Sequence, residues 1–200
     1  LLSQQLQHIR GELQEWRDKK DPEPDHSEAV GRSRQLLEEK GIPFQQFYKV
    51  VDFGEQMGEE QASLLEEALL SMGVLDALIV PAEYRETVLK LDGGVCDRYI
   101  FSDVTRVKQN LLELLDVDNG ENDILKYQSV SHILSSIGVY GKCVPGEDKG
   151  ARDGKEAAGE IGCTWVNKEG NYRIGVLEGT VTGAYQACYI GVRARERYRR

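Results

Sequence analysis

The sequence predicts a mixed α/β domain with a helix at each end of the chain. Three observations predict it. Apolar residues recur at helical spacing in several segments, short apolar and aromatic runs alternate with these segments without a regular βαβ count, and a heptad-like stretch and an Arg-rich stretch stand at the two ends. The 200 residues can bury a real core, and 40% apolar with 30% charged residues is typical of a globular protein.

Residues 1–20 carry the most regular pattern. Five apolar residues recur at intervals of four and three along one side of a helix: Leu2, Leu6, Ile9, Leu13 and Trp16. This spacing predicts an incoming coiled-coil helix with these residues as its seam, although a single amphipathic helix packed on its own domain would show the same pattern. Because the pattern is already under way at Leu1, we expect the chain to be a piece of a longer protein.

A proline-rich linker, residues 21–27, separates this helix from the main domain, which we place at residues 28–191. Pro22 and Pro24 break the helix because proline lacks an N–H and restricts the residue before it. Ser27 is a suitable N-cap for a new helix, which should run to about Lys40 and end at Gly41 in a left-handed conformation.

The pattern then predicts further elements along the main domain. We expect strands at residues 44–53, 76–80 and 98–101, and helices at residues 59–72, 104–115 and 129–136, with Gly73 ending the first of these helices. Residues 138–162 are rich in glycine and charge, which indicates a long mobile loop or an edge crossing.

The clearest hairpin lies near the C-terminal end. Residues 163–166 and 172–176 should be its strands, joined by a turn at Asn167–Asn171 in which Gly170 supplies a positive φ. From about Tyr185 the chain should become helical and basic, so residues 192–200 are expected to begin a returning coiled-coil helix.

No arrangement of residues predicts catalysis or cofactor binding. Gly150–Lys155 resembles a phosphate loop only superficially, since Glu156 replaces the Ser or Thr that would hold Mg²⁺. The acidic group at residues 116–123 lacks calcium ligands at two required positions, and three histidines stand apart: His8, His26 and His132. The four cysteines form no CxxC pair, which favours a reducing, cytoplasmic setting. We therefore expect no enzyme activity, catalytic residue, metal or cofactor within this chain.

The charge distribution bears on nucleic-acid binding. A net charge of −9 and a pI near 5.0 argue against a free-standing nucleic-acid binder, and no apolar run approaches a membrane span. The C-terminal arginines are a solvated helical face or contacts to phosphates. The candidates for DNA contact are Arg193, Arg195, Arg197 and Arg199. We expect weak or no DNA binding.

Two regions of the chain carry a resemblance to a known family. The closing region contains Thr164-Trp165-Val166, the run 172–179, Tyr189-Ile190-Gly191 and Ala194-Arg195-Glu196-Arg197, and the opening region contains the runs 41–44, 50–53, 64–70 and 75–81. Together they resemble the hinge of the MukB-like (JetC-type) SMC ATPase subunits of Wadjet anti-plasmid defence systems, over roughly residues 30 to 197. The chain departs from the family at Thr180-Val181-Thr182, where members often have an aromatic and a basic residue, so no ligand or DNA contact carries over there.

The resemblance implies a compact SMC-like hinge with flanking antiparallel coiled-coil helices. The parent would be an ATPase with heads at its far ends. It would bind a kleisin-type subunit, small winged-helix subunits and a nuclease, extrude DNA loops and act on plasmid DNA. Within this chain the implied role is homodimerisation, and the alternative is a nucleic-acid-binding module that uses the Arg-rich helix.

We expect the dimer interface in the hairpin region. An isolated hairpin is marginally stable, exposed strand edges invite pairing with another chain, and glycines permit close backbone approach. The residues expected at the interface are Trp165, Tyr172, Ile174, Gly175, Val176 and Gly179.

Overall fold

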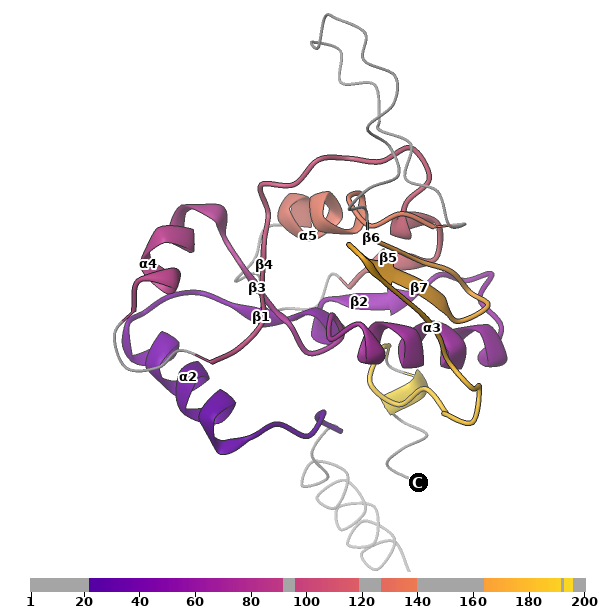
Figure 1. Ribbon diagram of the computed structural model, residues 1–200, viewed down its shortest axis with the longest axis horizontal. Helices are drawn as coiled ribbons and strands as arrows, with labels where there is room; N and C mark the ends of the chain where they lie inside the picture. Colours follow the sequence, from indigo (N-terminus) through magenta and orange to yellow (C-terminus); the bar gives the residue numbers. More distant parts are fainter. Residues whose placement is uncertain (1–21, 92–95, 119–126, 140–163, 192, 196–200) are drawn as a thin grey trace, which may run out of the picture.

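The computed structural model describes residues 22–91, 96–118, 127–139, 164–191 and 193–195 (Figure 1). Its α-helices are α2 (Glu28–Glu39), α3 (Glu59–Ser71), α4 (Arg85–Leu89) and α5 (Tyr127–Leu134). Three short 3-10 helices are η1 (Phe47–Lys49), η2 (Ala82–Tyr84) and η3 (Leu111–Glu113). The strands are β1 (Gln45–Gln46), β2 (Val51–Phe53), β3 (Leu78–Val80), β4 (Tyr99–Phe101), β5 (Leu115–Val117), β6 (Thr164–Val166), β7 (Asn171–Ile174) and β8 (Leu177–Thr180). The mixed α/β class is confirmed.

The strands form three small sheets. In the first, β3 pairs antiparallel with β1 and parallel with β4. The second is the antiparallel pair β2–β5, and the third is the antiparallel meander β6–β7–β8. Within the described residues no helix is long and apolar enough to cross a membrane.

Two apolar clusters hold these elements together, and β3 lies between them. Ile79 belongs to the larger cluster, which α3, α5 and the second and third sheets surround. Leu78 and Val80 belong to the smaller cluster under α2 and α4. Successive strand residues point to opposite faces, so one short strand serves both cores. Figure 1 shows the two groups of helices on either side of this strand.

The helices with clear end signals form as the sequence predicts. The Ser27 hydroxyl accepts the Val30 N–H at the start of α2, and Gly41 follows the helix with φ of 66°. Gly73 ends α3 with φ of 72°. Glycine alone adopts these angles at little cost, which is why both positions stop a helix.

Three predicted elements are wrong. Residues 104–115 form no α-helix, because the Val107 and Leu111 N–H groups donate to carbonyls of Ser135 and Ile137 instead of making helical bonds. Residues 44–53 do not form one strand, since the turn η1 divides β1 from β2. The chain does not become helical at Tyr185, and only residues 193–195 after that point are helical among those described.

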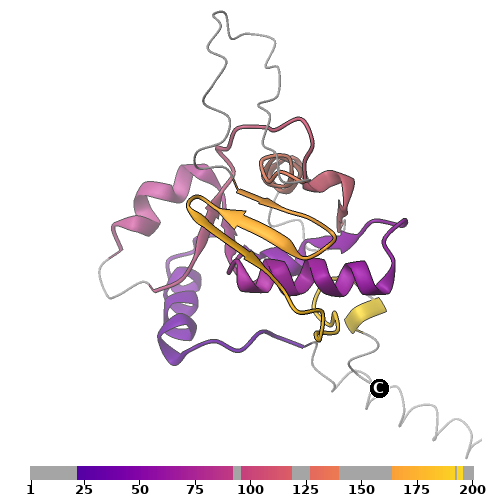
Figure 2. The same cartoon turned by 45° about the vertical axis from the view of Figure 1, so that its right-hand side comes forward.

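The predicted hairpin is confirmed and has a third strand. Gly170 has φ of 81° in the turn between β6 and β7. The chain turns again at Gly175-Val176 and returns as β8, whose N-terminal residue Leu177 pairs with Ile174. The sheet lies over α3 (Figure 2), and Leu64 of that helix faces Gly170.

Candidate functional site

A buried carboxylate on α3 holds the segment that leads to the C-terminal end of the described chain. Glu66 is fully buried and accepts N–H donors from Cys188 at 2.7 Å, Tyr189 at 3.1 Å and Ile190 at 2.7 Å. The Tyr185 hydroxyl also donates to Glu66, at 2.7 Å. These four donors satisfy a carboxylate that would otherwise be costly to bury. The segment is therefore fixed to α3 by a charged group as well as by packing.

Two neighbours of Glu66 extend this attachment along α3. The Ser63 hydroxyl accepts the Ala187 N–H at 3.1 Å, and the Glu67 carboxylate accepts the Gly183 N–H at 3.1 Å. Burial raises the pKa of the Tyr185 phenol, as do its contacts with Cys188 and Glu66. Burial also raises the pKa of the Cys188 thiol. Both groups stay protonated at neutral pH, so this cysteine is no reactive thiolate.

The incoming chain is held close to the same place. Pro22 and Pro24 are buried, and the Glu23 carboxylate lies 3.4 Å from Lys49 Nζ. Tyr48, beside this lysine, is 1% exposed and meets the ring of Tyr189 edge-on at a centroid distance of 5.9 Å. Burial raises the pKa of Tyr48, and the charge of Glu23 adds to this rise. Figures 1 and 2 both show the incoming and outgoing segments at one end of the body.

The outgoing residues lie against acidic side chains. Arg193 is exposed, whereas Arg195 is half-buried, with its guanidinium 3.6 Å from the Asp118 carboxylate and its Nε donating to the Gly191 carbonyl. Arg195 therefore has partners within the chain. The other two predicted contacts, Arg197 and Arg199, lie outside the described residues, as do the five seam residues of the N-terminal segment: Leu2, Leu6, Ile9, Leu13 and Trp16.

The six predicted interface residues lie on different parts of the third sheet. Tyr172 and Ile174 are partly buried against the larger core, on the same face as the fully buried Val166. Trp165 pairs with Arg173 and so belongs to the opposite face. The remaining three residues belong to the outer strand of the sheet and to the turn before it: Gly175 and Val176 form the turn, and Gly179 belongs to β8.

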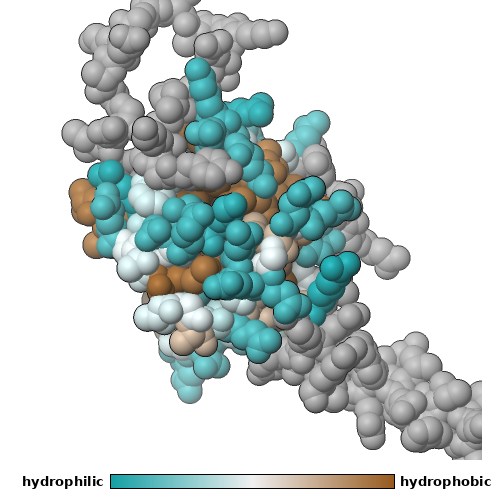
Figure 3. Space-filling model, turned by 90° about the vertical axis from the view of Figure 1, so that its right-hand side faces the viewer, coloured by the Kyte–Doolittle hydropathy of each residue, from teal (hydrophilic) through white to brown (hydrophobic). Residues whose placement is uncertain are grey.

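Few large apolar side chains are exposed among the described residues, and two of them are adjacent at the tip of the β7–β8 hairpin. Among the described residues the large exposed ones are Leu70, Leu89, Val176 and Leu177. Val176 is 91% exposed and Leu177 is 67% exposed. Hydrophilic side chains cover most of the face in Figure 3, with hydrophobic ones visible between them. The tip of the β7–β8 hairpin is thus unusual in presenting two neighbouring apolar residues to solvent.

Gly179 lies beneath an aromatic ring. It pairs with Tyr172 across the two strands, and a Cβ atom at residue 179 would overlap the Tyr172 ring. The ring therefore occupies the space that a side chain on β8 would need. Arg173 and Glu178 pair on the other face, with 3.3 Å between guanidinium and carboxylate.

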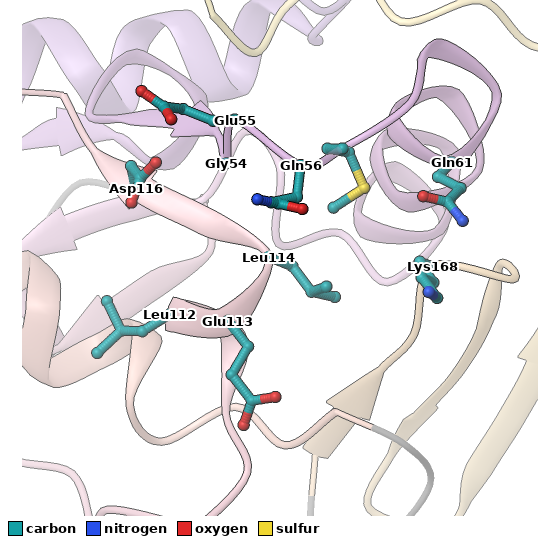
Figure 4. Close-up of a pocket in the computed structure, with 10 residues that line it drawn as sticks. Gly54, Glu55, Gln56, Gln61, Leu112, Glu113, Leu114, Asp116 and Lys168 are labelled. Atoms are coloured by element: carbon teal, nitrogen blue, oxygen red, sulfur yellow. The ribbon is translucent and has the colours of Figure 1, made fainter.

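A polar hollow of ≈ 590 Å³ opens between the β2–α3 turn and η3 (Figure 4). Gln56 and Gln61 lie on one side of it, Glu113 on another, and Lys168 reaches it from the β6–β7 turn. A neighbouring cleft of ≈ 770 Å³ extends from here to the outgoing residues. Its walls carry five carboxylates and one arginine: Asp52, Glu55, Glu59, Asp116, Asp118 and Arg193.

The described residues contain no group of three or more His, Cys, Asp or Glu side chains placed to hold a metal ion. Asp52 and Asp116 stand directly opposite in the β2–β5 pair, and Glu55 lies near Asp116 in Figure 4. Of the histidines, His26 contacts the Pro24 carbonyl and His132 lies on α5. The phosphate-loop-like segment 150–155 lies outside the described residues.

Sequence reasoning missed two buried ionic groups. Glu66 follows Ala62 by four residues and precedes Leu69 by three, so helical spacing alone places it on the buried side of α3. Arg34 of α2 donates to both Asp76 oxygens, at 3.1 and 2.6 Å, and to Asp97 at 2.8 Å. No local signal joins these three, which lie far apart in the sequence.

No known protein family, curated protein or solved structure matches this chain.

Proposed function

We propose that this domain is the homodimerisation hinge of a long coiled-coil, cytoplasmic SMC-like ATPase that acts on plasmid DNA. One observation carries the proposal: the incoming residues 22–24 and the outgoing residues 189–191 lie at one end of the body, where the Tyr189 ring contacts Tyr48 and the Glu23 charge acts on the same tyrosine. A hinge has to send its two arms away together, because they form one antiparallel coiled coil.

The attachment of both segments supports the same role. The Glu66 carboxylate accepts backbone N–H bonds from the outgoing segment, and Pro22 and Pro24 of the incoming segment are buried. Both anchors belong to the same domain, so the two proposed arms would leave it from one end. ATPase heads and the kleisin-type, winged-helix and nuclease subunits belong to the proposed parent protein, outside this chain.

The alternative, a nucleic-acid-binding module, has less support. Arg195 already has Asp118 as a partner, and the cleft beside Arg193 is lined by carboxylates, which repel phosphates.

Size-exclusion chromatography with light scattering tests the proposal. The 22.5 kDa chain should elute at twice its monomer mass at micromolar concentration. A monomer mass under these conditions would overturn the hinge. Arm geometry is a second readout, in which spin labels at Asp25 and Arg193 within one chain should report a short distance.

A further inference from the structure

The strand β8 has a free edge whose hydrogen-bonding groups can be assigned. The described part of the chain pairs β8 with β7 alone. The Val181 N–H donates to the Gly170 carbonyl, on the β7 side. Because backbone groups alternate along an antiparallel strand, Leu177 and Gly179 also bond toward β7, whereas the backbone groups of Glu178 and Thr180 point away from it.

The edge strand β8 carries one charged side chain and no proline. Natural edge strands are guarded by charges, prolines or bulges. Glu178 is the only charged residue between Arg173 and Arg193, in a protein with 30% charged residues, and its charge is offset by Arg173. Val176 and Leu177 add exposed apolar surface at the start of the same strand.

We propose that β8 pairs antiparallel with β8 of a second copy of this chain, about a two-fold axis at Gly179. This inference rests on the proposed homodimeric function and assigns the surface through which the two copies bind each other. It moves the interface from the faces of the sheet, where Tyr172 packs on the core, to the edge and tip formed by residues 176–181. The two meanders then form one continuous sheet of six strands.

Charge and backbone spacing select this register. If the axis passed through Glu178, two carboxylates would face each other, which is destabilising. With the axis at Gly179, Glu178 lies opposite Thr180 of the second copy, and Leu177 lies opposite Val181 of the second copy. The two Gly179 residues then form a non-hydrogen-bonded pair, where the strands approach most closely, at about 4.5 Å between Cα atoms. Glycine suits this position because it has no side chain.

Two substitutions test the surface without disturbing the fold. Leu177→Lys places a charge at the seam, and Leu89→Lys is its matched control, since Leu89 is 63% exposed on α4. Thr180→Pro removes an N–H that makes no bond to β7, so it should block strand pairing without removing a hydrogen bond within the monomer. We expect Leu177→Lys and Thr180→Pro to raise the dimer dissociation constant at least about tenfold, and Leu89→Lys to leave it unchanged.

Cross-linking tests the register. In a background with its native cysteines replaced by alanine, Glu178→Cys combined with Thr180→Cys should give an intermolecular disulfide, because directly opposite hydrogen-bonded residues lie about 5.5 Å apart. Each single variant should cross-link poorly. Efficient linking by Glu178→Cys alone would refute the Gly179 axis.

The outcomes separate the two proposals. A native chain that is monomeric overturns both the hinge and the paired edge. A native dimer that survives Leu177→Lys and Thr180→Pro keeps the hinge and overturns the β8 seam.

Discussion

The ring of Tyr48 meets the ring of Tyr189 edge-on, at 5.9 Å between centroids and 63° between planes. Tyr48 precedes Lys49, whose Nζ lies 3.4 Å from the Glu23 carboxylate of the incoming chain, and Tyr189 belongs to the outgoing segment. The ring contact therefore joins two parts of the chain that are separated by most of the sequence. Edge-to-face pairs of this kind add stability beyond simple burial. The segment carrying Tyr189 in turn depends on Glu66, whose charge is the first feature to test.

Replacing Glu66 by Gln should destabilise the domain by about 2–3 kcal/mol, because the amide has one acceptor oxygen and its NH2 group must face either the Cys188 N–H or the Ile190 N–H. Urea unfolding measures the change. Glu67→Gln is the matched control on the same helix and should cost at most about 1 kcal/mol, since its bond to Gly183 is exposed. Equal losses in the two variants would show that Glu66 has no special role.

Gly179→Ala should destabilise the domain by about 1–3 kcal/mol, because the new methyl group overlaps the Tyr172 ring. The cause can be isolated by a double-mutant cycle. In a Tyr172→Ala background the same substitution should cost less than half as much. A cost that is independent of Tyr172 would point to backbone strain instead.

Arg34→Leu should cost about 3–5 kcal/mol, because it leaves Asp76 and Asp97 buried without their cation. Burial lowers the pKa of Arg34, but its bonds to both carboxylates raise that pKa more, so the group is charged at every practical pH. Arg32→Leu on the same helix is the control, and since its pair with Glu28 is exposed, thermal unfolding should barely change.

Stability should fall at high pH. The pKa values of Tyr48, Tyr185 and Cys188 are raised mainly by burial, and that of Tyr99 is raised to about 12. A raised pKa means that the folded state binds the proton more tightly than the unfolded state does. The contribution of these groups is complete below the unfolded pKa, about 8.5 for cysteine and about 10 for tyrosine, and is lost as pH rises above it.

Melting temperatures measured from pH 7 to 11 should therefore drop most steeply above about pH 10. Tyr185→Phe should flatten this dependence, although it lowers stability at neutral pH by removing the bond to Glu66. An unchanged slope in this variant would contradict burial of the phenol as the cause.

Duplex DNA should bind this chain weakly and without sequence preference, since the net charge is −9 and Arg195 is paired with Asp118. Fluorescence anisotropy at physiological salt measures the affinity. Sub-micromolar binding that is lost on charge reversal at Arg193 would favour the nucleic-acid-binding alternative.

Several elements could be predicted from the sequence because their signals are local. Ser27 and Gly41 bound α2, Gly73 ends α3, and Gly170 makes the β6–β7 turn. Each depends on a few adjacent residues, whose capping or positive φ acts wherever the chain goes. The strand β8 escaped prediction because its four residues include Gly179 and no regular alternation.

Other elements depend on distant partners. Residues 104–115 have a helical pattern, but the Val107 N–H pairs with Ser135, and Asn110 bridges to Gly138. Backbone groups bonded to another segment are unavailable for helical bonds, so tertiary pairing overrides propensity.

The sequence by itself determined the mixed α/β class, the caps of α2, the end of α3 at Gly73 and the β6–β7 hairpin, because each follows from spacing or from one residue's backbone preference. Only the tertiary structure decided where the charged groups went. It buried Glu66 beneath the N–H groups of residues 188–190, joined Arg34 to Asp76 and Asp97, and brought Tyr48 against Tyr189. These contacts link residues far apart in the chain, and their energies depend on burial that no local pattern of residues encodes.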